Sequence, residues 1–67
     1  MHINELSDRE LLRKIIYLRD CTQADVAEDL GVDRSVVSKV VNEKLNLRPA
    51  TRRLAERLLE QAEKTKE

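Results

Sequence analysis

The only glycine in the chain, Gly31, separates two short segments whose apolar residues recur at helical spacing. Thr22 is placed as the N-cap of the first segment, and Asp33 as the N-cap of the second. Gly31 follows the last apolar residue of the first segment, where a left-handed C-cap favours a residue without Cβ. This pattern predicts two helices, over about residues 23–30 and 34–42, joined by a turn of three residues.

The side chains of this segment also fit two helices that cross steeply at a tight turn. Ala27 supplies the small residue needed where the two axes approach, and Val32 supplies an apolar side chain in the turn. The other inward positions are all apolar: Val26, Leu30, Val37, Val40 and Val41. Valine is a mediocre helix former, but the caps and the spacing of three and four residues favour a helix over a strand. Residues 22–42 are therefore predicted to form a helix-turn-helix.

A helix over about residues 8–20 is expected ahead of this unit. Ser7 and Glu10 form a capping-box pattern at its start, and Asp8 is assigned to its solvated face. Its inward residues are predicted to be Leu11, Leu12, Ile15, Ile16 and Leu18. Tyr17, near its end, is expected to pack against the core.

A fourth helix is expected over about residues 49–63, because Pro49 suits the first helical position. Its inward stripe is predicted to consist of Ala50, Leu54, Leu58 and Ala62, widened by Ala55 and Leu59. In the loop before it, Leu45 and Leu47 are expected to reach the core.

The predicted fold is all-α, a compact four-helix domain containing a helix-turn-helix over residues 7–64, after a flexible N-terminus at residues 1–6. A chain of 67 residues has room for one domain. One cysteine and one histidine cannot form a disulfide or a structural zinc site, so no metal is expected. No catalytic constellation or phosphate-binding glycine loop is present, so neither an enzyme nor a cofactor is expected. Without an apolar run of membrane length or a signal-peptide pattern, a cytoplasmic protein with no membrane partner is expected.

Charge is distributed unevenly along this chain of zero net charge. Residues 1–33 hold four basic and eight acidic side chains, whereas residues 34–67 hold nine basic and five acidic ones. Within residues 34–53, six basic side chains accompany a single acid, Glu43. Such a division points to a surface that faces a polyanion, although a solvated basic face without a partner gives the same pattern.

Two families resemble residues 22–42. Thr22 to Ala27, read together with Gly31-Val32, resembles the phage-repressor family of Cro-like and Xre-like helix-turn-helix domains. The longer run from Thr22 to Asn42, continued by Thr51-Arg52, is similar to the DNA-binding headpiece of the lactose-repressor family. The long helix expected before the motif matches the Xre-like pattern and departs from the lactose-repressor pattern. The resemblance covers about residues 11–60 and implies a free-standing domain that binds double-stranded DNA.

The outward positions of the helix at 34–42 are expected to enter the major groove and contact bases: Arg34, Ser35 and Lys39. Arg34 and Lys39 can donate to guanine, while Lys39 and Ser35 occupy base-reading positions of the lactose-repressor pattern. The resemblance implies phosphate contacts at Thr22, Ser38, Asn42, Asn46 and Thr51. The start of the preceding helix, with Thr22 and Gln23, suits a phosphate. The backbone-contacting set is completed by Val36, which can also touch a thymine methyl, and by Lys44, Arg48 and Arg52.

The sequence thus favours a sequence-specific transcriptional regulator, a repressor of phage or mobile-element type, without a small-molecule effector domain. A homodimer is expected because one such domain reads few bases, and the fourth helix is its candidate interface. The alternative is a protein-interaction module that has this fold but does not bind DNA. A third possibility is the DNA-binding headpiece of a larger repressor.

Overall fold

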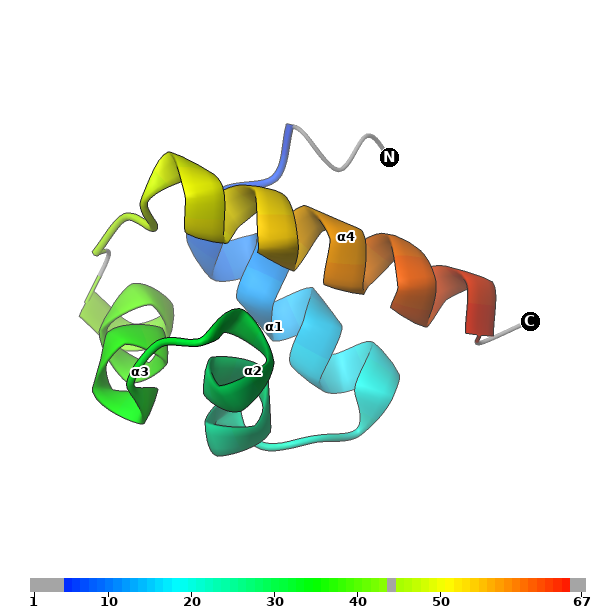
Figure 1. The fold of residues 1–67 in the computed structure, drawn as a ribbon, viewed down its shortest axis with the longest axis horizontal. Coiled ribbons are helices and arrows are strands. Elements are labelled where there is room, and N and C mark those ends of the chain that lie inside the picture. Colours follow the sequence, from blue (N-terminus) through cyan, green and yellow to red (C-terminus); the bar gives the residue numbers. More distant parts are fainter. Residues whose placement is uncertain (1–4, 44, 66–67) are drawn as a thin grey trace.

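The computed structural model describes residues 5–43 and 45–65, and this part of the chain is built from four helices. They are α1 (Asp8–Arg19), α2 (Gln23–Leu30), α3 (Arg34–Glu43) and α4 (Pro49–Thr65) (Figure 1). The predicted all-α, four-helix fold is confirmed. Residues 1–4 of the predicted flexible N-terminus lie outside the described residues.

Helix ends agree with the sequence prediction to within two residues. Helix α1 ends at Arg19 because Asp20 adopts a left-handed conformation, with φ of 51°, and serves as the C-cap. Helix α3 continues to Glu43 and α4 to Thr65, slightly beyond their predicted ends. Such differences are usual where a final helical turn meets solvent.

Local capping explains where the helices begin and end. The predicted capping box of α1 is present, since Ser7 Oγ accepts from the Glu10 amide while the Ser7 amide donates to the Glu10 carboxylate. The chain reverses after α2 at Gly31, whose φ of 72° is the left-handed C-cap expected there. Helix α3 starts after Asp33, whose carbonyl accepts from the amide of Val36 over 3.0 Å. The α2–turn–α3 unit therefore has the predicted helix-turn-helix order.

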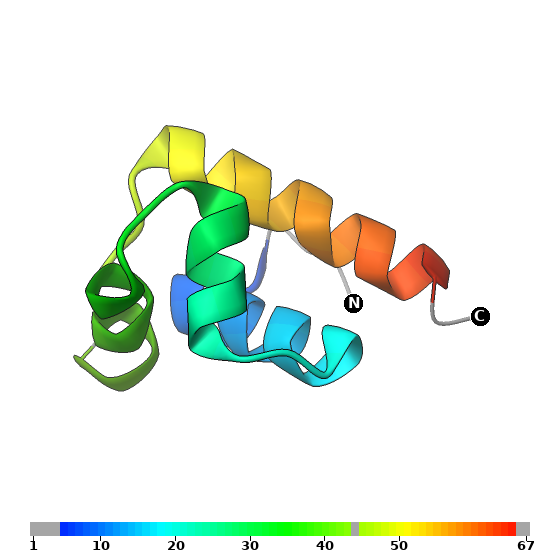
Figure 2. The ribbon, with the colours of Figure 1, turned by 60° about the horizontal axis from the view of Figure 1, so that its bottom comes forward.

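The core lies between α1, α4 and the helix-turn-helix. Fully buried side chains come from each helix, including Leu11, Leu12 and Ile15 of α1, Val26 of α2, Val37 and Val40 of α3, and Leu59 of α4. Helices α1 and α4 run side by side in the same direction, while α2 and α3 pack against α1, and α2 also contacts α4 (Figures 1 and 2). Helix α3 lies at one end of the molecule, the same end at which α4 begins (Figure 1).

Three predictions about apolar side chains are wrong. Tyr17 is 79% exposed, because it lies on the face of α1 opposite the buried leucines. Leu45 is 44% exposed, and only Leu47 of the α3–α4 loop reaches the core. The buried stripe of α4 is Ala55, Leu59 and Ala62, so that Ala50 is exposed and Leu54 is 44% exposed. Helix α4 is thus rotated relative to the predicted orientation, and part of its apolar surface faces solvent.

The described helices include none with both the length and the apolar character needed to span a bilayer.

Candidate nucleic-acid interface

Helix α3 has one face in the core and the opposite face in solvent. Val37, Val40 and Val41 are buried, and they hold the helix against α1 and α2. Residues 35, 39 and 42 occur at helical spacing on the opposite side, and the side chains of Ser35, Lys39 and Asn42 are exposed. Two polar groups and one cation are therefore presented together by a helix whose position is determined by packing.

The flanks of this exposed face carry the other predicted α3 contacts. Arg34, the first residue of α3, is exposed, whereas Val36 and Ser38 are half-buried. The side-chain amide of Asn42 donates to Ser38 Oγ over 3.3 Å, so these two side chains restrain each other within the helix. A phosphate oxygen could still accept from the second amide hydrogen of Asn42.

The amino end of α2 is closed by a capping box that the sequence prediction described only in part. Thr22 Oγ1 accepts from the Asp25 amide over 3.2 Å, and the Asp25 carboxylate accepts from the Thr22 amide over 3.1 Å. Thr22 is exposed and Gln23 is half-buried. The Asp25 carboxylate places a negative charge at this helix end, and Glu28 adds a second exposed carboxylate on α2, whereas Asp29 is paired with Arg19 over 2.6 Å. The positive potential of the candidate interface therefore belongs to α3 and the loop that follows it, not to α2.

The loop between α3 and α4 holds the remaining exposed polar groups. Asn46 and Arg48 are exposed, whereas Lys44 lies outside the described residues. Hydrogen bonds hold the loop on both sides of Asn46. The Leu45 amide donates to the Lys39 carbonyl over 3.4 Å, and the Leu47 amide donates to Asp8 Oδ2 over 2.7 Å. Asn46 is therefore held between two anchored neighbours.

Arg52 does not lie free on this surface. Its Nη1 donates to Asp8 Oδ1 over 2.5 Å, its Nη2 to the Leu6 carbonyl over 2.6 Å, and its Nε to Glu56 Oε2 over 3.0 Å. The hydrogen bond that Arg52 donates to Asp8 raises the pKa of its guanidinium most; burial opposes this effect, and the hydrogen bond donated to Glu56 adds to it. The guanidinium is thus occupied within the chain, which disfavours the predicted phosphate contact by Arg52. Thr51, beside it, is half-buried.

Asp8 is the residue whose role the sequence analysis missed. The sequence predicts a solvated position for Asp8, yet its side chain is only 12% exposed and joins the loop and α4 to the start of α1. Its partners, Leu47 and Arg52, are 39 and 44 positions away in the chain. No local pattern could have revealed such a contact, because capping and periodicity report only on neighbours within one or two helical turns.

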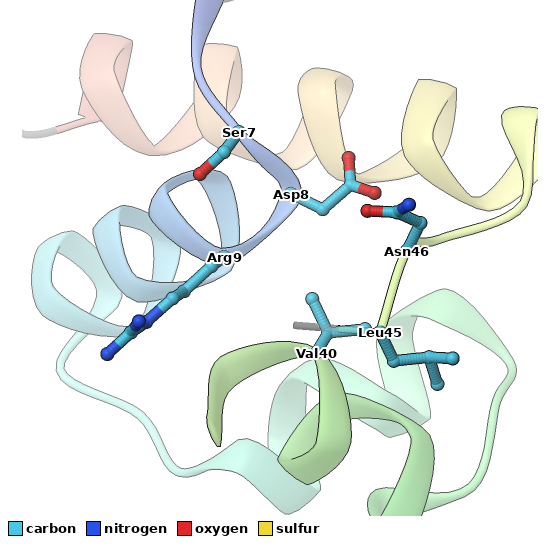
Figure 3. A pocket seen from close by; sticks show the side chains of 6 residues that line it. All are labelled: Ser7, Asp8, Arg9, Val40, Leu45 and Asn46. Carbon is cyan, nitrogen blue, oxygen red and sulfur yellow. The ribbon is translucent and has the colours of Figure 1, made fainter. Parts of the chain in front are cut away.

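A pocket of about 320 Å³ lies between the amino end of α1 and the α3–α4 loop, lined by Ser7, Asp8, Arg9, Val40, Leu45 and Asn46 (Figure 3). The side chain of Arg9 extends along α1, away from Asp8 and Asn46, and its buried Nε has no hydrogen-bond partner among the described residues. Asp8 is the one carboxylate in this lining and is already held by Arg52 and Leu47. The described lining therefore offers no unengaged acid for catalysis.

No protein-family model, curated protein or solved structure matches the chain.

Proposed function

We propose that this chain is a sequence-specific double-stranded DNA-binding transcriptional regulator, a repressor of phage or mobile-element type that acts as a homodimer. The observation that carries the proposal is the exposed face of α3, formed by Ser35, Lys39 and Asn42 with Arg34 at its edge. A helix at one end of the molecule, with its valines in the core and polar groups outward, has the shape and chemistry to lie in a major groove.

Each group on this face has a defined task in the proposal. Arg34 and Lys39 donate to guanine edges, and Ser35 donates to or accepts from a neighbouring base. Asn42, Asn46 and Arg48 bind phosphates on either side of the groove, which sets the register of the helix. Thr22, Gln23 and Ser38 add weaker contacts to the DNA backbone at the other flank. The negative charge of Asp25 repels phosphate there and weakens these contacts. Val36 is half-buried and contributes a methyl contact.

The test is selection of bound sites from a random duplex pool at about 0.1 M salt, a concentration that still permits phosphate contacts. The chain is compared with a double variant, Arg34→Ala with Lys39→Ala. The matched control is Arg13→Ala with Lys64→Ala, which removes two exposed cations away from α3. We expect a motif with the unaltered chain and the control, and none with the α3 variant. If all three bind equally weakly and select no motif, α3 is not a recognition helix.

A protein-interaction module is the second candidate, and one observation favours it. Leu45 is 44% exposed beside Val40 in the lining of the pocket, at the border of the candidate interface. An apolar side chain at this position suits a protein partner better than a phosphate. Failure of the duplex selection, together with binding of a partner that Leu45→Glu abolishes, would favour this alternative.

A further inference from the structure

Arg9 carries a charge that its surroundings in the chain do not compensate. It lies in the first turn of α1 and is half-buried. Among the described residues its guanidinium takes part in no hydrogen bond and no ion pair, and its Nε is also shielded from solvent. A cation that is partly withdrawn from water normally has an acceptor, because the lost hydration is otherwise not replaced. By contrast, the Arg52 guanidinium donates to two carboxylates and a carbonyl. Arg9 therefore has unused capacity to bind an anion.

The position of Arg9 connects it to the candidate interface. Helix α1 packs against α3, and the pocket at the amino end of α1 has Arg9 on one side and Asn46 on the other (Figure 3). Val40 of α3 and Leu45 of the following loop complete the side of the lining that faces α1. Asn46 is exposed and is itself a predicted phosphate contact. The pocket thus links the loop that follows α3 to the first turn of α1.

The carboxylates near the pocket do not cancel the charge of Arg9. Asp8 is the one carboxylate of the described lining, and it is neutralised by its ion pair with Arg52. The Glu10 carboxylate accepts from the Ser7 amide over 3.1 Å in the capping box of α1. A phosphate at this pocket therefore meets an unpaired cation and no unpaired acid of the described lining.

We propose that Arg9 binds a phosphate of the DNA backbone on the side of the pocket opposite Asn46, so that the DNA interface extends from α3 across the pocket onto α1. The inference rests on the proposed function and deepens it, because it adds a contact from a helix outside the helix-turn-helix. A guanidinium suits a phosphate because its planar fork of N–H groups can donate to two oxygens at once. Such a contact carries no base information, so it strengthens binding to every duplex and leaves the selected motif unchanged.

The first experiment measures binding of the full chain to a duplex of arbitrary sequence, by fluorescence anisotropy between about 50 and 200 mM salt. Arg9→Met removes the guanidinium but keeps a side chain of similar length, and should reduce the slope of log affinity against log salt by about 1. Over this range of salt the affinity then changes about threefold less than for the unaltered chain. Arg9→Lys should keep the slope, because lysine binds phosphate as a point charge. The matched control is Arg57→Met, which removes an exposed arginine of α4 outside the pocket lining and should also keep the slope.

Urea unfolding separates this role from a structural one. An arginine that stabilises the fold loses that contribution when it is replaced, whereas a donor that lacks a partner until DNA binds costs stability in the free chain. The urea midpoint of Arg9→Met should therefore equal or exceed that of the unaltered chain, while its affinity for the duplex falls. A lower midpoint together with an unchanged salt slope would show that Arg9 serves the fold and not DNA.

Inorganic phosphate tests whether a free phosphate occupies the site in place of the DNA backbone. The Arg9 Nε–H resonance, assigned in heteronuclear NMR spectra by its absence from Arg9→Met, should shift when the duplex is added. It should stay in place when millimolar inorganic phosphate is added alone. An equal shift with inorganic phosphate would assign the site to the free anion and overturn the DNA contact.

The outcomes for Arg9 and for the proposed function are distinguishable. Duplex binding with an unchanged slope in Arg9→Met removes Arg9 from the interface and leaves the proposed function in place. A slope that depends on Arg9, without a selected motif, supports the contact and overturns sequence-specific regulation. Absence of duplex binding by the unaltered chain overturns both.

Discussion

Arg52 and Asp8 lie 44 positions apart in the chain, yet Arg52 Nη1 donates to Asp8 Oδ1 over 2.5 Å. Asp8 Oδ2 also accepts from the Leu47 amide, and Arg52 also binds the Leu6 carbonyl and Glu56. One carboxylate and one guanidinium thus join the amino end of α1, the α3–α4 loop and the first turns of α4. This network fixes the α3–α4 loop, which carries Asn46 and Arg48. It therefore stabilises one part of the candidate interface.

Arg52→Ala should lower the free energy of unfolding by about 1–3 kcal/mol, because it leaves the half-buried Asp8 carboxylate without its cation. The side chains are 21% and 12% exposed, so this ion pair is better shielded than an ordinary surface pair. Urea unfolding followed by circular dichroism measures the change. Arg13→Ala is the control, since Arg13 is an exposed arginine in a helix, and should change stability by less than about 0.5 kcal/mol. Equal midpoints for the two variants would contradict the structural role of Arg52.

Gly31→Ala should lower the free energy of unfolding by about 1 kcal/mol, because alanine disfavours the left-handed backbone conformation. Gly31 has φ of 72°, and a Cβ added there would meet no heavy atom within 4 Å. The penalty is therefore that of an L-residue in the left-handed region and includes no steric clash. Gly31→Asn should cost less than Gly31→Ala, because asparagine tolerates this region better than alanine does. If urea unfolding shows that the Gly31→Ala variant is more stable than the Gly31→Asn variant, the left-handed conformation of residue 31 does not cause the loss of stability.

Features of the fold that depend on near neighbours could be predicted from the sequence. Ser7, Thr22 and Gly31 act within three or four residues of their own positions, so their patterns located the starts of α1 and α2 and the end of α2. The inward valines of α3 follow from periodicity in the same way, and so does the exposure of Lys39 on the opposite side. These local rules sufficed for the helix-turn-helix and for most of its outward face.

Features that depend on distant parts of the chain could not be predicted. The rotation of α4, which buries Ala55 and leaves Leu54 exposed, is set by packing against α1. Periodicity identifies an apolar helix surface but does not say which part of a wide one meets the core. The burial of Asp8 and its pairing with Arg52 were missed for the same reason, since a charged residue on a helix is usually solvated and the sequence does not show a partner 44 positions away.

The carboxylate of Glu10 makes the stability of α1 sensitive to acid. Hydrogen bonds with the amide and then with the hydroxyl of Ser7 lower the pKa of the Glu10 carboxyl below its ordinary value. A group whose folded pKa is lowered contributes stability above its unfolded pKa, and that contribution is lost as the pH falls through the folded pKa. Glu10→Gln should therefore flatten the decrease in stability below about pH 4.5, as measured by urea unfolding at a series of pH values. An unchanged pH profile would show that the capping box is not formed in solution.

Arg48 and Arg52 should differ in how they affect binding to DNA, because only Arg48 has its side chain in solvent at the candidate interface. Each phosphate contact releases counterions, so losing one reduces the slope of log affinity against log salt by about 1. Arg48→Ala should reduce the slope in this way on any duplex, measured by fluorescence anisotropy between about 50 and 200 mM salt. Arg52→Ala, measured at a temperature where it is folded, should keep the original slope. The opposite result, a smaller slope for Arg52→Ala alone, would mean that its guanidinium leaves Asp8 to bind phosphate. A slope near zero for the unaltered chain would instead count against DNA as the partner.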